Sequence, residues 1–219
     1  MCIRDRDESE PSDYSLQIWS NFALGVLLAL VQIPRALIDL AESKAADTDV
    51  AEKAMSVKIA VADSLIGLVL IARCGLTLYS NARLPKEIQT ILAMASVLEA
   101  LSGGALILLS WSKAYFWSFN SRGFVKFLKV VEVVVQFLLT GLSVLCAVAA
   151  ASLTAAFTTA RSWTEFGLQM GSLIMTQGAL MTTAAIDLNP KGSLPAYTPV
   201  ALVVVATVLD LGSGITNVV

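Results

Sequence analysis

Four acidic residues stand inside long apolar stretches of the sequence: Asp63, Glu99, Glu132 and Asp210. A carboxylate inside a membrane is costly, and where one occurs it commonly serves a proton or cation path. Asp63, Glu99 and Asp210 are therefore candidate relay acids of a small channel or transporter. The alternative is that these helices lie partly at the membrane surface, where the acids face water or lipid headgroups. Glu132 follows Lys129 by three residues and can pair with it on a helix.

The residue types that most enzyme sites need are missing from the sequence. It contains no histidine, which excludes Ser-His-Asp triads, histidine general bases and histidine zinc sites. Cys2, Cys74 and Cys146 are isolated and form no metal-binding or disulfide pattern. A nucleophile elbow and a phosphate-binding glycine loop are also absent from the sequence. We therefore expect no enzymatic activity, no cofactor and no bound metal.

The composition places these acids in a membrane. The chain has 219 residues, of which 56% are hydrophobic and 15% charged, with a mean hydropathy of +0.74; soluble domains carry about 25% charged residues. Val133–Ala160 has no charged side chain over 28 residues, whereas about 20 apolar residues suffice to cross a bilayer. The formal net charge of −2 gives no basic field for nucleic acid. The sequence predicts an all-α integral membrane protein with five to six apolar helices.

Residues 1–13 are predicted to be a disordered acidic tail, whose first six residues resemble a cloning or assembly scar. Residues 14–219 are predicted to form a single helical membrane domain that ends in an apolar hairpin at 166–219. Pro34 is expected to mark a kink or the end of the first segment, and Asp49 is expected to cap the second helix. The predicted apolar segments are Tyr14–Pro34, a helix from about Val50 to Arg73, Ile88–Trp111, Val133–Ala160, Phe166–Ile186 and a last helix from Tyr197.

Two stretches have the pattern of amphipathic helices at a membrane surface, Val50–Ala72 and Arg122–Val131. In the second, Arg122, Lys126 and Lys129 recur at i, i+4 and i+7 and form one basic face. Such a face suits the acidic lipids of a bilayer surface. Alternatively, these side chains extend to the interface from the start of the long span. At least one interfacial amphipathic helix is expected.

Glycines lie along one stripe of the fifth segment at Gly167, Gly171 and Gly178. Small residues at this spacing let helix backbones approach closely inside a membrane. The stripe predicts a helix-packing surface and self-association of the protein into a homo-oligomer. The alternative is a chance match in a glycine-rich apolar segment.

Two stretches resemble the peroxin-11 family of peroxisomal membrane proteins. The first is Ala72–Arg83, which is similar to that family's Arg-x-Gly-Ile/Leu turn and polar connector. The second is the C-terminal hairpin, where Ser172-Leu173, Gly178, Leu180, Ala184 and Leu188-Asn-Pro-Lys191 precede a last apolar helix opened by Thr198-Pro199. The family's basic N-terminal amphipathic segment has no counterpart in residues 1–34.

The resemblance implies a non-enzymatic protein that shapes membranes and promotes elongation, proliferation and fission of peroxisomes. Its implied partners are the lipid bilayer, further copies of the same chain and the fission machinery. This is the leading hypothesis from the sequence. The alternatives are a small channel or transporter that uses the acids named above, and a structural subunit of a larger membrane complex.

Overall fold

The structure, a computed structural model, describes residues 11–80, 86–153 and 160–218. Within these ranges the chain forms six long helices and no strand, which confirms the expected all-α fold. The predicted tail lies mostly outside the described residues, although Pro11 already begins the first helix. The helices are α1 (Pro11–Lys44), α2 (Thr48–Ser80), α3 (Lys86–Ser118), α4 (Arg122–Leu153), α5 (Ala160–Leu188) and α6 (Thr198–Val218).

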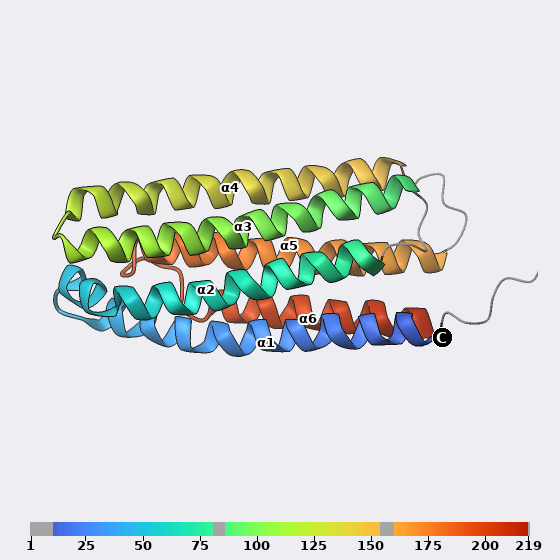
Figure 1. Ribbon diagram of the computed structural model, residues 1–219, viewed down its shortest axis with the longest axis horizontal. Coiled ribbons are helices and arrows are strands. Elements are labelled where there is room, and N and C mark those ends of the chain that lie inside the picture. The colour runs from blue at the N-terminus through green and yellow to red at the C-terminus, as the bar shows by residue number, and fades with distance from the viewer. Residues whose placement is uncertain (1–10, 81–85, 154–159, 219) are drawn as a thin grey trace, which may run out of the picture.

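The helices alternate in direction and lie side by side along one axis (Figure 1). Each packs against the next in the sequence, α6 closes the ring against α1, and α3 also contacts α5. The beginning of α1 and the end of α6 lie at the same end of the bundle (Figure 1). This antiparallel order follows from the short connections, which leave consecutive helices little room to separate.

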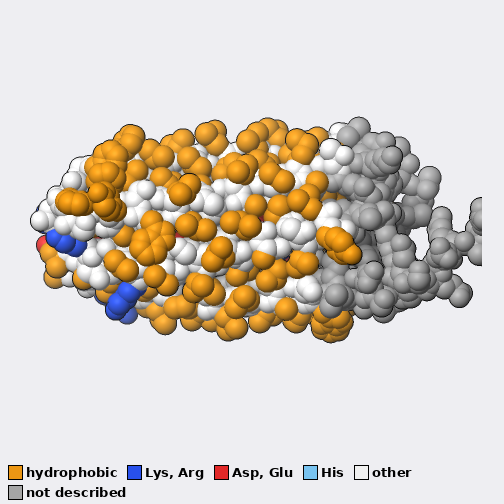
Figure 2. All heavy atoms as spheres, viewed as in Figure 1, with side chains coloured by type: hydrophobic (Ala, Val, Ile, Leu, Met, Phe, Trp, Pro, Cys, Tyr) orange, Lys and Arg blue, Asp and Glu red, His pale blue; other side chains and the backbone are white. Residues whose placement is uncertain are grey.

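The outer surface of the bundle is apolar. Exposed large hydrophobic side chains occur along α1 to α4 and α6. On α5 they occur only near the two ends of the helix, at Trp163 and Leu188. Figure 2 shows hydrophobic side chains spread over the visible face, with Lys and Arg side chains confined to one end. Five helices, α1 to α4 and α6, are long and apolar enough to cross a membrane. The fold is that of a helical membrane protein.

The fifth helix is the most enclosed. From Leu168 to Asp187 no residue of α5 is exposed. This helix carries many small and polar side chains, and it is not among the five that are apolar enough to span by composition. Its neighbours shield it from the surroundings, so it does not need a lipid-compatible surface of its own.

Several predicted boundaries are wrong. Of the two expectations for Pro34, the end of the segment is wrong: α1 continues for ten residues beyond it, because Arg35, Asp39 and Glu42 lie one turn apart on a buried face and pack inside the bundle. Helix α2 likewise continues past Arg73 to Ser80 instead of giving way to a connector.

The cap of α2 also lies two residues earlier than predicted. Asp47, not Asp49, caps the helix, since its Oδ1 accepts hydrogen bonds from the amides of Asp49 and Val50 at 3.0 and 3.3 Å. A short carboxylate just before the first helical residue satisfies amides that have no partner within the helix.

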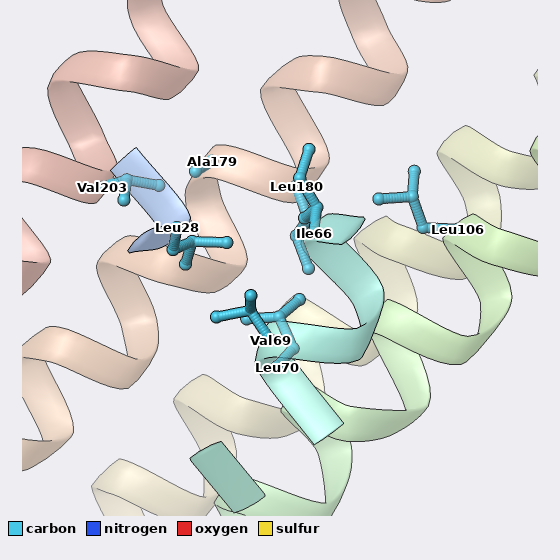
Figure 3. Close-up of a cluster of buried hydrophobic side chains, with 8 residues drawn as sticks. All are labelled: Leu28, Ile66, Val69, Leu70, Leu106, Ala179, Leu180 and Val203. Carbon is cyan, nitrogen blue, oxygen red and sulfur yellow. The ribbon is translucent and has the colours of Figure 1, made fainter. Parts of the chain in front are cut away.

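A cluster of eight buried side chains from five helices forms the main apolar core (Figure 3). Beside it, α2 and α3 approach through Gly67 and Gly103. A Cβ atom added at Gly67 would lie 2.6 Å from the Gly103 carbonyl oxygen and 2.6 Å from Ile107. Two helix backbones can come this close only where both residues lack a side chain. The core residues are Leu28, Ile66, Val69, Leu70, Leu106, Ala179, Leu180 and Val203.

The glycine stripe of α5 packs within the chain. A Cβ atom at Gly171 would lie 3.2 Å from Leu209 of α6, and one at Gly178 would lie 3.7 Å from Leu202. A Cβ atom at Gly167 would meet nothing within 4 Å. Two of the three glycines therefore lie where α5 packs against α6 in the expected hairpin. These contacts do not test self-association, which stays a prediction.

We expect Gly67→Ala to destabilise the protein by about 1–3 kcal/mol, because the new methyl group forces α2 away from α3. Thermal unfolding in detergent, followed by circular dichroism, measures the effect. The matched control is Gly104→Ala on α3, where a Cβ atom would meet nothing within 4 Å; this change should be neutral or stabilising by up to about 1 kcal/mol. Equal unfolding temperatures for the two variants would contradict the close crossing.

Candidate functional site

The interior of the bundle contains charged side chains in two separate clusters. We call the first the Asp187 cluster. It draws side chains from five helices, α1 to α5. Its members are Arg35, Asp39, Glu52, Asp63, Ser110, Lys113, Trp117, Lys129, Glu132 and Asp187, all buried.

Lys113 joins α3 to two other helices. Its Nζ donates a hydrogen bond to Glu132 Oε2 of α4 at 2.6 Å and another to Asp187 of α5. Asp187 also lies 3.7 Å from Arg35 Nη2 of α1. One carboxylate at the end of α5 therefore lies between two cations from different helices, which fixes the helices relative to one another.

Arg35 joins α1 to α2. Its Nε donates to Asp63 Oδ1 at 2.9 Å, and a second guanidinium nitrogen pairs with Asp39 one turn later on α1. Ser110 of α3 donates a hydrogen bond to the other oxygen of Asp63. Both oxygens of this carboxylate are therefore satisfied although the residue is completely buried.

Glu52 completes the cluster near the beginning of α2. It accepts a hydrogen bond from Trp117 Nε1 at 2.6 Å and another from Lys129 of α4. A cavity of about 10 Å³ lies among Glu52, Lys113, Trp117 and Asp187. This is close to the smallest volume that holds a single water molecule.

The second group, the Arg73 cluster, lies between α2, α3, α5 and α6. Arg73 Nη2 is 2.7 Å from Asp210 Oδ2, and Nη1 is 3.8 Å from Glu99 Oε1. The guanidinium also donates hydrogen bonds to Ser172 and, at 3.3 Å, to Thr176. Both oxygens of Glu99 are buried without a hydrogen-bond partner.

Asp63 and Arg73 are ten residues apart on α2, which corresponds to about 15 Å along a helix axis. The apolar core of Figure 3 occupies this interval. Ile66, Val69 and Leu70 lie between the two clusters on α2, and Leu106 lies between them on α3. Apolar packing thus separates the charged groups on the α2 side of the bundle.

On the opposite side, polar side chains bridge the same interval. Gln136 Nε2 donates to the Ser102 carbonyl oxygen at 3.0 Å, and Ser102 Oγ donates to Gln177 Oε1 at 2.9 Å. Gln136 lies one turn from Glu132 on α4, and Gln177 follows Thr176 directly on α5. We call Ser102, Gln136 and Gln177 the glutamine layer. It lies between the two clusters, and all three of its residues are buried.

Carboxylates outnumber cations in both clusters. Among the described residues, the Asp187 cluster contains five carboxyl groups and three cationic side chains, and the Arg73 cluster contains two and one. Carboxylates that share a buried site cannot all stay ionised without a further positive charge. The surplus acids must therefore hold protons or be compensated by a cation that enters the site.

The structure separates the three candidate relay acids. Glu99 and Asp210 meet at Arg73, whereas Asp63 belongs to the Asp187 cluster, so the three do not converge on one cavity. None of the three faces water or headgroups, because Asp63 and Glu99 are completely buried and the side chain of Asp210 is 10% exposed.

The three residues of the predicted basic face differ in exposure. Arg122 and Lys126 are exposed at the beginning of α4, and Arg122 lies 3.7 Å from Asp49. The interpretation of Lys129 as a membrane-surface residue is wrong, because this side chain is buried against Glu52. The suggested pairing of Glu132 with Lys129 is replaced by the pairing of Glu132 with Lys113.

Sequence reasoning missed the cations that hold the acids in place. Arg35, Arg73 and Lys113 are not among the candidate site residues that the sequence predicts. One signal was available for α1: Arg35, Asp39 and Glu42 recur at i, i+4 and i+7, which is the spacing of a polar helix face. For Lys113 the partners are 19 and 74 residues away in the sequence, and no local pattern indicates them.

Comparison with protein-family models, with curated proteins and with solved structures gives no match to this chain. The resemblance to the peroxin-11 family stays a prediction.

We expect Lys113→Met to destabilise the protein by about 3–5 kcal/mol, because it leaves Glu132 and Asp187 buried without their shared cation. The matched control is Arg122→Met, which removes an exposed ion pair and should change stability by less than about 1 kcal/mol. Unfolding in detergent with increasing sodium dodecyl sulfate measures both variants. A loss at Lys113 no larger than that at Arg122 would contradict a paired charge in the interior.

Proposed function

We propose that the protein conducts protons across a membrane through its buried carboxyl groups. This is the channel or transporter hypothesis from the sequence, restricted to protons by the geometry of the interior. The cavity in the Asp187 cluster has room for about one water molecule, so a larger solute does not fit the conformation described.

The observation that carries the proposal is Glu99. It is completely buried, its two oxygens have no hydrogen-bond partner, and its nearest cation, Arg73, lies at 3.8 Å and pairs more closely with Asp210. A buried carboxylate with so few polar partners is poorly stabilised in its charged form. Intramembrane acids of this kind are typical of proton relays.

The proposal is supported by polar side chains that lie along the interval between Glu99 and the Asp187 cluster. Glu99 lies one turn from Ser102 on α3, Ser102 contacts both glutamines, and Gln136 lies one turn from Glu132 of the Asp187 cluster. Gln136 Oε1 and Gln177 Nε2 are buried without a hydrogen-bond partner. These free polar atoms supply the additional hydrogen bonds that a transient water molecule or a passing proton requires.

The membrane-shaping hypothesis is a second prediction that these contacts leave untested, together with the peroxisomal location, the oligomer and the fission partners. The polar stripe of α2 that suggested a surface helix faces the bundle interior, where Glu52, Ser56 and Asp63 are buried. From Val61 to Leu78 the exposed face of α2 is apolar. Among the described residues, the polar pattern of α2 is thus used within the bundle.

The test is proton flux into liposomes that contain the purified protein, a pH-sensitive dye and a potassium gradient clamped with valinomycin. The native chain should acidify the vesicle interior faster than empty vesicles do. Glu99→Gln keeps the size of the side chain and removes its titration, so the flux should fall at least about tenfold, as expected for loss of a general acid–base step.

The control is Asp49→Asn, which removes an acid at the surface of the bundle and should leave the flux unchanged. Flux no greater than that of empty liposomes, or native flux in Glu99→Gln, would overturn the proposal. The interior charges would then serve only to hold the helices together.

A further inference from the structure

A groove of about 420 Å³ runs along the outside of the bundle between α1 and α2. Its volume is within the range of about 300–1,000 Å³ that is usual for ligand sites. The walls are apolar except for one lysine. The lining residues are Leu30, Val31, Pro34, Ile38, Val57, Lys58, Val61, Ala62 and Leu65.

The groove faces the lipid. Leu30 is 57% exposed, Val61 47% and Leu65 48%, and in a membrane these side chains meet acyl chains. Pro34 lies in the groove wall and has no amide hydrogen, so the carbonyl of Leu30 receives no hydrogen bond from it. The local backbone of α1 is therefore less tightly bonded along the groove.

Lys58 lies where a lipid phosphate would lie. It is exposed, and among the described residues it has no ion-pair partner. Tyr79 is exposed near the other end of α2, 21 residues after Lys58, and every exposed residue between the two is uncharged. That interval corresponds to about 32 Å of helix, which matches the roughly 30 Å hydrocarbon core of a bilayer. Lys58 therefore marks one edge of the hydrocarbon, at headgroup level.

We propose that this groove binds one acidic glycerophospholipid, with an acyl chain against the apolar walls and the phosphate against Lys58. This occupant matches the chemistry of the groove. Its walls are apolar and exposed to lipid, and at one end lies Lys58, an unpaired cation at the depth of the headgroups. A lipid without net negative charge can fill the groove but leaves the positive charge of Lys58 without a counter-charge. The proposal concerns binding and does not depend on proton conduction.

The experiment is lipid titration of the purified protein in detergent, followed by native mass spectrometry, with phosphatidylglycerol and phosphatidylcholine of identical acyl chains. The native protein should bind phosphatidylglycerol more tightly. Lys58→Ala should weaken phosphatidylglycerol binding by about fivefold, the value for one basic residue at a lipid surface, and should leave phosphatidylcholine binding unchanged. Lys58→Arg should preserve the preference.

Lys191→Ala is the matched control, since Lys191 is also an exposed lysine but lies in the connection between α5 and α6, outside the groove; it should bind both lipids as the native chain does. Val61→Trp fills the slot and should weaken binding of both lipids. Soluble glycerol phosphate should not displace the lipid. Equal affinity of the native chain for the two lipids, or equal losses in Lys58→Ala and Lys191→Ala, would overturn the proposal.

Discussion

The cost of burying charge without a partner governs this structure. Each carboxyl group in the Asp187 cluster meets a cation, and all except that of Asp39 meet one from another helix, because an unpaired carboxylate inside the bundle would be severely destabilising. Lys113 thereby fixes α3, α4 and α5 together, and Arg35 fixes α1, α2 and α5. Arg73 does the same for α2, α3 and α6. The rotation of each helix about its axis follows from these pairings, since any other rotation would turn a charge toward the surface.

The arrangement is the reverse of a water-soluble bundle, with polar groups inside and apolar groups outside. In a bilayer the apolar surface gains nothing by leaving lipid, so helices associate through close packing and polar contacts instead. Both are present at the α2–α3 crossing, where Gly67 meets Gly103 and where Asp63 and Glu99 each lie one turn away on their own helices. The proposed function starts from the same feature, because proton conduction is proposed for interior acids that outnumber their cations.

The sequence predicted the elements better than their contacts. Length and hydropathy were sufficient for the apolar helices and for the C-terminal hairpin, because membrane spans have a strong local signal. The helix ends at Pro34 and Arg73 were wrong because buried partners from other helices sustain the helix beyond them. Asp63, Glu99 and Asp210 were recognisable as unusual acids, but their division into two clusters depends on partners far away in the sequence. Lys129 shows the limit most clearly: its basic i, i+4, i+7 pattern is identical to that of its exposed neighbours, and only the position of Glu52 decides that it is buried.

The central claim is that α2 turns its charged face inward and its apolar face toward lipid. Spin labels attached in turn at Leu65 and Leu68 on the apolar face, and at Ser56, Ile59 and Ile66 on the inward face, in a chain whose native cysteines are replaced, test it directly in liposomes. Collision with lipid-soluble oxygen should be high at Leu65 and Leu68, and collision with a water-soluble nickel chelate should be low; labels at Ser56, Ile59 and Ile66 should be shielded from both. High nickel accessibility at Leu65 and Leu68, or oxygen accessibility that peaks on the face of Ser56 and Asp63, would contradict the inverted bundle.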